Sequence, residues 1–226
     1  MVKRFIKGVY ELKPTFPKYS ATWDVDDVLR YLENMAPVEL LTNKEVSQKL
    51  AMLIALLSGQ RCQTIHALDI KSMKLQENKC VFTVNTKIKQ SKRGRHVKPI
   101  ELLGFKDNIS LCVIQTLKEY LRRTKEKRQS DKLFLSYQKP YAPISKDTLA
   151  RWVRDILSKA GVDTGVYGAH STRAASTSAA AARGAPIDVI MKAAGWSAES
   201  TFTKYYKKTP AINMGQVLLD SYIKSN

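Results

Sequence analysis

The segment Ala169-His170-Ser171-Thr172-Arg173 opens a run of alanine, serine and threonine that continues to Ala182. We predict a helix over 169–182, and its small side chains favour a central position because neighbouring backbones can approach them closely. His170 and Arg173 are three residues apart, so they share one face of this helix. Two cationic side chains aimed at one point suit a phosphate oxygen. Packing of the same helix face against an acidic neighbour would also explain such a pair.

Segments on both sides of this pair add residues of related chemistry. Upstream, Gly59-Gln60-Arg61 directly follows an apolar stretch, and Lys89 precedes a polar, basic turn. Downstream, Gly195-Trp196 is followed about ten residues later by Tyr205-Tyr206. The order arginine, lysine, His-x-x-Arg, Gly-Trp and tyrosine is far more specific than any one of its parts.

Hydrophobic periodicity and capping residues predict an α+β, mostly α-helical domain with a small antiparallel β-sheet. Thr42 and Glu45 form a predicted capping box for a helix that ends near Gly59. Two predicted strands joined by the polar turn 90–94 make a β-hairpin with a basic tip. The predicted helices span 24–33, 43–58, 111–123, 145–160, 169–182, 186–194, 199–206 and 213–222, and the predicted strands span 79–86, 95–102 and 132–136.

The charge of the chain points to a polyanionic partner. Lysine and arginine total 38 against 20 acidic residues, which gives a formal net charge of +18 on a chain with 44% hydrophobic residues. Nucleic acid is the first candidate for such a partner and an anionic membrane the second. The apolar stretch Leu50–Leu57 is far shorter than the roughly 20 residues of a membrane span. The three cysteines include no C-x-x-C pair and no signal peptide is recognisable, so we expect an intracellular, nuclear protein.

The sequence offers no evident site for a metal or a nucleotide cofactor. Metal-dependent nucleases need clustered carboxylates, and the one tight group, Asp24, Asp26 and Asp27, lies at a helix start, where carboxylates favour the helix dipole. No glycine-rich phosphate loop occurs. We therefore expect no metal and no cofactor.

The ordered set resembles the active site of the tyrosine recombinases, such as the phage integrases, over a stretch from about Lys7 to Tyr206. It is most similar to the eukaryotic Crypton and DIRS-like transposon recombinases. Their segments read much like Gly59-Gln60-Arg61, Lys89–His96, Ala169–Arg173 and Ala193–Ser197. The resemblance implies a tyrosine-recombinase catalytic domain with the DNA breaking-rejoining fold. Such an enzyme cleaves and rejoins double-stranded DNA through a 3′-phosphotyrosyl intermediate, without metal or ATP.

The resemblance also implies a role for each residue of the set. Arg61 and Arg173 bind the non-bridging phosphate oxygens, because a planar guanidinium binds phosphate through paired hydrogen bonds. Lys89 protonates the leaving 5′-oxygen as a general acid. His170 orients or deprotonates the nucleophile, and Trp196 donates its indole N–H to the phosphate.

The nucleophile is one of two adjacent tyrosines. Tyr205 lies nine residues after Trp196, which is the commonest spacing in the wider family. The Crypton-like pattern of phenylalanine followed by tyrosine corresponds to Tyr205 followed by Tyr206. We assign Tyr206 as the nucleophile and keep Tyr205 as the alternative. Thr64 departs from the family pattern, since many relatives carry an acidic residue three positions after the first arginine.

The resemblance further predicts how the chain meets DNA and other protomers. We expect residues 1–20 to be a lead-in from a missing N-terminal core-binding domain and residues 21–226 to be the catalytic domain with its C-terminal helix. That helix joins protomers into a dimer or tetramer on DNA, or folds back on its own chain, through Leu218, Leu219, Tyr222 and Ile223. Phosphate-backbone contacts are expected from Lys87, Lys92, Arg93, Arg95 and Lys98.

Two other functions share parts of this pattern. A domesticated descendant would keep the fold and bind DNA without catalysis, although the complete set of six site residues argues against such decay. A type IB topoisomerase shares the phosphotyrosine chemistry, but its signature differs from His-x-x-Arg with Gly-Trp. The target DNA sequence and the choice among excision, integration and inversion are not encoded in any readable motif.

Overall fold

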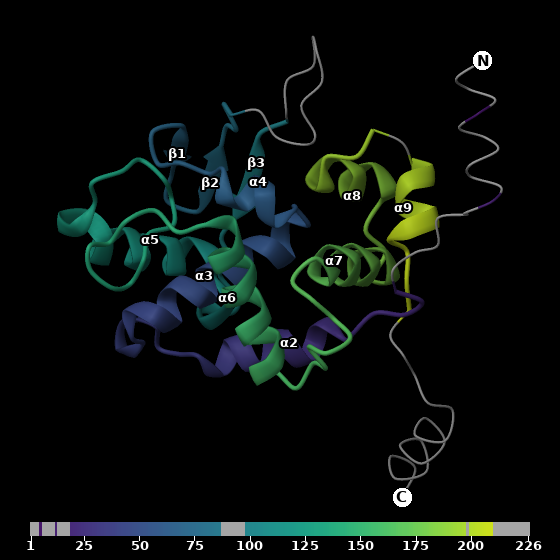
Figure 1. The fold of residues 1–226 in the computed structure, drawn as a ribbon, viewed down its shortest axis with the longest axis horizontal. Coiled ribbons are helices and arrows are strands. Elements are labelled where there is room, and N and C mark those ends of the chain that lie inside the picture. The colour runs from purple at the N-terminus through teal and green to yellow at the C-terminus, as the bar shows by residue number, and fades with distance from the viewer. Residues whose placement is uncertain (1–4, 6–11, 13–18, 87–97, 198, 210–226) are drawn as a thin grey trace, which may run out of the picture.

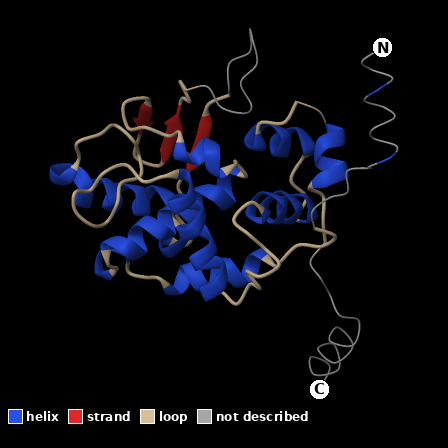
Figure 2. Ribbon diagram, viewed as in Figure 1, coloured by secondary structure: helices blue, strands red, loops and turns tan. Residues whose placement is uncertain are grey.

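A computed structural model describes residues 5, 12, 19–86, 98–197 and 199–209 of the chain. Helices predominate in this part, and one small three-stranded sheet lies against them (Figures 1 and 2). The predicted α+β, mostly helical class with a small antiparallel sheet is therefore confirmed. None of the described helices is long and apolar enough to cross a lipid bilayer.

Helix α3 (Asn43–Ser58) forms the centre of the main hydrophobic core. Its predicted capping box is confirmed, because the Thr42 hydroxyl accepts a hydrogen bond from the Glu45 amide and the Glu45 carboxylate accepts one from the Thr42 amide. The helix is buried on nearly all sides, since α5, α6 and α7 all pack against it. Helices α2 (Val25–Asn34), α5 (Val113–Thr124) and α6 (Lys146–Lys159) contribute further residues to this core.

The sheet is antiparallel, with strand order β1 (Met73–Leu75), β2 (Lys79–Phe82) and β3 (Ile100–Leu103). Its register pairs Cys80 with Leu102 and Phe82 with Ile100, and all four side chains are buried. The alternating apolar residues thus fix which face of the sheet meets the helices.

Helices α7 (Ser171–Ala182), α8 (Ile187–Ala194) and α9 (Glu199–Tyr205) gather on one side of the molecule (Figure 1). Helix α7 lies between two cores: its residue Ala175 belongs to the main core, and Ala180 and Ala181 pack against a smaller second core. The second core consists of Ile190, Ala194, Trp196 and Phe202, with Tyr206 packed against it. The prediction that the helix of small residues is central is therefore confirmed.

Several predicted boundaries differ from the structure. The strands are shorter than predicted, and β1 and the short helix α4 (Cys62–His66) were not predicted. The predicted strand 132–136 is wrong, because within the described residues this segment makes only isolated bridges. Pro186 was predicted to be the first residue of a helix over 186–194. In the structure it is the N-cap of α8, which begins one residue later at Ile187. The predicted hairpin turn and the predicted helix 213–222 lie outside the described residues. Short 3-10 helices span Val38–Leu40, Ile109–Leu111 and Lys125–Lys127.

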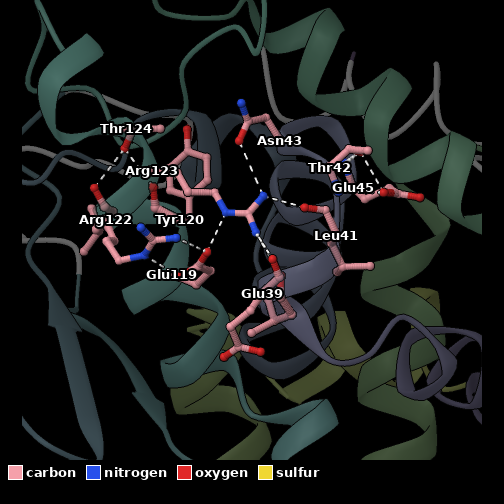
Figure 3. A network of polar contacts seen from close by, with 12 residues as sticks. Glu39, Leu41, Thr42, Asn43, Glu45, Glu119, Tyr120, Arg122, Arg123 and Thr124 are labelled. Atoms are coloured by element: carbon pink, nitrogen blue, oxygen red, sulfur yellow. Dashed lines mark hydrogen bonds and ion pairs between the residues drawn. The ribbon is translucent and has the colours of Figure 1, made fainter.

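A polar network fastens α5 to the turn before α3 (Figure 3). Arg123 donates hydrogen bonds to the backbone carbonyls of Val38, Glu39 and Leu41 and to the carboxylate of Glu119. Glu119 is buried, and hydrogen bonds from Arg122 lower the pKa of its carboxyl to about 2. The network therefore fixes the position of α3, from whose C-terminal end the candidate site is built.

Candidate active site

Helix α7 carries the His-x-x-Arg pair at its N-terminal end. His170 is the N-cap and is exposed, whereas Arg173 is buried with an exposed fraction of 1%. The imidazole centroid of His170 lies 6.4 Å from the ring centroid of Tyr206, and Cζ of Arg173 lies 5.3 Å from the same centroid. The two side chains, predicted to share a helix face, thus meet at one tyrosine ring.

The segment Gly59-Gln60-Arg61 joins the end of α3 to this site. Gly59 ends α3 with a left-handed backbone (φ 57°), and its carbonyl accepts a 2.6 Å hydrogen bond from Nη1 of Arg173. Nε2 of Gln60 donates a 2.6 Å hydrogen bond to the carbonyl of Ala193, which holds the end of α8. Arg61 follows as the N-cap of α4 and is half-buried. Three consecutive residues therefore tie α7, α8 and α4 to α3.

Gly195 and Trp196 join the site from the end of α8. Gly195 has a left-handed backbone (φ 68°), and the Trp196 amide donates to the carbonyl of Met191 at 3.0 Å, which is the hydrogen-bond pattern of a glycine-terminated helix. This turn places the indole ring of Trp196 over Arg173, with 4.1 Å between Cζ and the ring centroid. The same ring lies 4.7 Å from the ring of Tyr206, centroid to centroid.

Tyr206 lies one residue beyond the end of α9 and is half-buried. Its amide donates to the carbonyl of Phe202 at 2.8 Å, so the chain continues the helical turn up to this residue. Its carbonyl accepts a 2.5 Å hydrogen bond from Oγ of Ser178 on α7. The ring therefore stands beside Arg173, Trp196 and His170, which come from two other elements.

The electrostatics of the site favour an anionic ligand. Burial, and next the nearby charge of Arg61, together lower the pKa of Arg173 to about 9, while Tyr206 acts in the opposite direction. Nε and Nη2 of Arg173 and Nε1 of Trp196 are buried and have no hydrogen-bond partner within the described part of the chain. No carboxylate of the described residues forms an ion pair with either arginine.

Buried N–H groups without partners are costly, so their concentration at one point is typical of a binding site for a group that they can satisfy. A tetrahedral oxyanion such as a phosphodiester accepts several hydrogen bonds, and its negative charge would offset part of the charge of the two guanidinium groups. Groups of three or more metal-ligating side chains do not occur among the described residues.

Several predicted site residues lie outside the described residues: Lys87, Lys89, Lys92, Arg93 and Arg95. The side chain of Tyr205 is likewise outside the described part. Lys98 is described and is exposed two residues before β3. The structure thus brings Arg61, His170, Arg173, Trp196 and Tyr206 together.

Residues 23–211 match the family described as the phage integrase family. The chain belongs to the phage integrase family. Its mostly helical domain with a small antiparallel sheet is the catalytic fold of this family's tyrosine recombinases. Comparison with curated protein sequences finds no match.

Solved structures with a similar fold are recombinases. XerA recombinase matches with a TM-score of 0.62 and 18% identity over 94% of this chain and 66% of its own. XerH site-specific recombinase bound to difH substrate, in a pre-cleavage complex, matches with a TM-score of 0.60 and 18% identity over 82% of this chain and 49% of its own. A lambda integrase(75-356) dimer bound to a COC′ core site has a TM-score of 0.55 and 14% identity over 85% of this chain and 61% of its own. The present chain therefore spans about half to two thirds of these proteins.

Two residues that shape the site of this phage integrase family member were not predicted from its sequence. Gln60 was predicted only as part of a motif, yet it links α3 to the end of α8. Ser178 was one small residue among many in α7, yet it contacts the backbone of Tyr206. Neither contact has a local signal, because the partners are 133 and 28 residues away in the sequence.

Proposed function

We propose that this chain is the catalytic domain of a site-specific DNA recombinase that forms a 3′-phosphotyrosyl intermediate without metal or ATP. The observation that carries the proposal is the convergence of Arg173, Trp196 and His170 on the ring of Tyr206, with buried N–H donors that lack partners. Membership of the phage integrase family and the fold shared with recombinases support it.

In this proposal Arg61 and Arg173 hold the non-bridging oxygens of the scissile phosphate and stabilise the charge of the transition state. The Tyr206 hydroxyl attacks phosphorus, and the bond from phosphorus to the 5′-oxygen breaks. His170 orients or deprotonates the attacking hydroxyl. Trp196 donates its indole N–H to the phosphate while its ring packs against the tyrosine.

Lys89 protonates the leaving 5′-oxygen, so a free 5′-hydroxyl and a phosphotyrosyl bond result. The energy of the broken bond is retained in the new one, and a second 5′-hydroxyl can reverse the step. Double-stranded DNA is the substrate, with backbone contacts from the basic hairpin residues Lys87, Lys92, Arg93, Arg95 and Lys98.

The finer assignments also belong to this proposal. The resemblance of Gly59-Gln60-Arg61 and Ala169–Arg173 to segments of the Crypton and DIRS-like recombinases leads us to propose a role in transposition, in a nucleus. The predicted C-terminal helix joins protomers on DNA. Excision from a plasmid with paired target sites would test the transposition role.

The chemistry itself is tested with supercoiled plasmid in EDTA, followed by an SDS quench. Relaxed plasmid and covalent protein–DNA adducts are expected with the unmodified chain and with Tyr205→Phe, and their loss is expected with Tyr206→Phe. Loss only with Tyr205→Phe would transfer the role of nucleophile to Tyr205.

A domesticated, DNA-binding descendant is the competing function. It predicts salt-sensitive DNA binding with no adduct from any variant. The assay is then repeated with plasmids that carry candidate target sites, since the absence of a target site gives the same result. Absence of adducts in that experiment would favour the binding function.

A further inference from the structure

We propose that Ser178 is a positioning residue that aims Tyr206 at the bound phosphate. The inference rests on the proposed function, in which Tyr206 is the nucleophile. It assigns a role in the reaction to a side chain that does not itself touch the tyrosine hydroxyl or the arginine pair in the described contacts.

The Ser178 hydroxyl makes two hydrogen bonds to the chain around Tyr206. Oγ donates to the Tyr206 carbonyl at 2.5 Å and accepts from the Lys208 amide at 2.8 Å. The side chain is 95% buried, with an exposed fraction of 5%. One hydroxyl thus uses both its donor and its acceptor capacity on the backbone that follows the tyrosine.

This pattern is unusual for a serine inside a helix. Serine and threonine in helices commonly donate to the carbonyl four residues earlier. Ser47, Ser58, Thr116 and Thr177 of this chain all do so, at 2.7, 2.6, 3.0 and 2.7 Å. Ser178 instead directs its hydroxyl out of α7, so its contacts serve the neighbouring segment.

The contacted segment needs such a partner. Helix α9 ends at Tyr205, and the amides of Tyr206 and Lys207 are the last to bond back to Phe202. The described residues beyond this point, 208 and 209, make no further helical hydrogen bonds. Helix ends require external partners. Ser178 supplies them at the residue whose backbone sets the direction of the Tyr206 ring.

A second hydrogen bond attaches the segment 206–209 to the chain before α2. The Thr22 amide donates to the Thr209 carbonyl at 3.0 Å. The residue after Thr22, Trp23, donates from its indole Nε1 to Oγ of Ser171 at 2.8 Å. Helix α7 therefore fixes residues 206–209 directly through Ser178 and indirectly through Ser171.

Helix α7 therefore positions both reacting groups, the phosphate and Tyr206. The same helix carries Arg173, which would bind the phosphate, and Ser178, which holds the backbone of the attacking residue. Positional errors of about 1 Å can lower a rate by about 100-fold. Loss of the Ser178 hydroxyl should therefore affect the chemical step more than DNA binding.

The test is Ser178→Ala in the full 226-residue chain. Alanine has the higher helix propensity, so α7 itself is not weakened. At saturating supercoiled plasmid in EDTA, we expect covalent adducts to form about 10- to 100-fold more slowly, with the Kd for the plasmid unchanged within about twofold. Ser178→Thr, which keeps a hydroxyl, should recover part of the rate.

Limited trypsin digestion gives a readout that needs no catalysis. Lys207 and Lys208 offer cleavage sites in the held segment, and mass spectrometry identifies the peptides that end there. Cleavage after Lys208 should be faster in Ser178→Ala than in the unmodified chain. The matched control is Ser47→Ala, which removes another buried helical hydroxyl at a site remote from Tyr206.

An adduct rate within twofold of the unmodified chain in Ser178→Ala would overturn the proposal, as would an equal slowing in Ser47→Ala. Failure of the proposed function is a different result, in which the unmodified chain itself forms no adduct. In that case the trypsin readout still decides whether Ser178 holds the segment.

Discussion

The buried side chains of Arg173 and Lys49 are both cationic, but their surroundings differ. Arg173 lies against the rings of Trp196 and Tyr206 and near the charge of Arg61, and two of its buried guanidinium nitrogens have no hydrogen-bond partner among the described residues. Lys49 is fully buried in the main core, and its Nζ donates to the carbonyl of Met35. Burial lowers the pKa of Lys49 to about 8. The first cation has a place in the proposed chemistry, whereas the second is a cost to stability.

Replacing Lys49 with methionine should stabilise the protein below pH 8. The folded chain releases the Lys49 proton above about pH 8, while the unfolded chain keeps it to about pH 10.5. The unfolded state thus binds more protons in this window, so the stability of the unmodified chain rises with pH across it. We expect Lys49→Met to be more stable by on the order of 1–3 kcal/mol at pH 7, and the difference to shrink towards pH 10.5.

Urea unfolding at several pH values measures both quantities. Lys44→Met, at an exposed position of the same helix, is the control for loss of one positive charge. A stability difference that stays constant from pH 7 to pH 10.5 would show that burial of the Lys49 charge is not its cause.

At the scale of elements, the site is assembled where helices end. Gly59 ends α3, Gly195 ends α8, and Tyr206 follows the end of α9. Helix ends carry unsatisfied backbone groups and abrupt changes of direction. At these ends the Gly59 carbonyl holds Arg173, and Ser178 holds the chain after α9.

Gly59→Ala should impair both stability and activity. An alanine at φ 57° is strained, and its Cβ would lie 3.0 Å from Cγ2 of Thr177. We expect a loss of about 1–2 kcal/mol in the free energy of unfolding, together with a lower adduct rate because the strained backbone displaces the residue 59 carbonyl that anchors Arg173. Gly161→Ala is the matched control, since Gly161 has φ 85° but no atom within 4 Å of the added Cβ.

The control should lose a similar amount of stability through backbone strain and keep its adduct rate. Equal losses of adduct rate in both variants would mean that the contact between α3 and α7 has no special importance for the site. Chemical denaturation and the plasmid assay provide the two readouts.

Elements with local signals were predictable from sequence, and those that depend on distant partners were not. The capping box of Thr42 and Glu45 lies within four residues, so its signal is complete in the sequence. Strand β1 has three residues and gains its identity only by pairing with β2, so periodicity could not reveal it. The site motifs were predictable from a resemblance, whereas the roles of Gln60 and Ser178 depend on contacts between separate helices.

At the scale of the whole molecule, the formal net charge of +18 should dominate the first encounter with DNA. Lysines and arginines that contact phosphates release counterions, so the affinity falls as salt rises. The charge also steers association without regard to sequence. Specific recognition is therefore expected to require contacts beyond this electrostatic term.

Neutralising the hairpin should reduce the salt dependence of DNA binding. In the triple variant Lys92→Ala, Arg93→Ala, Arg95→Ala, each lost phosphate contact should lower the slope of log K against log salt by about 0.9. The total expected reduction is about 2–3, measured by fluorescence anisotropy with a labelled duplex. A triple variant at Lys139, Lys146 and Lys159 is the control, and an equal change in slope there would contradict a dedicated hairpin contact.

The hydrogen bond between the Thr22 amide and the Thr209 carbonyl has a mechanical consequence. It brings the segment before α2 next to the segment after α9. Both segments are attached to α7, the first by the bond from Trp23 to Ser171 and the second by the bond from Lys208 to Ser178. A load applied along either segment is therefore borne in part by α7, close to Tyr206, and in part by the main core, to which Trp23 belongs. Tension in the segments before α2 and after α9 and the orientation of the Tyr206 side chain are therefore coupled through these hydrogen bonds.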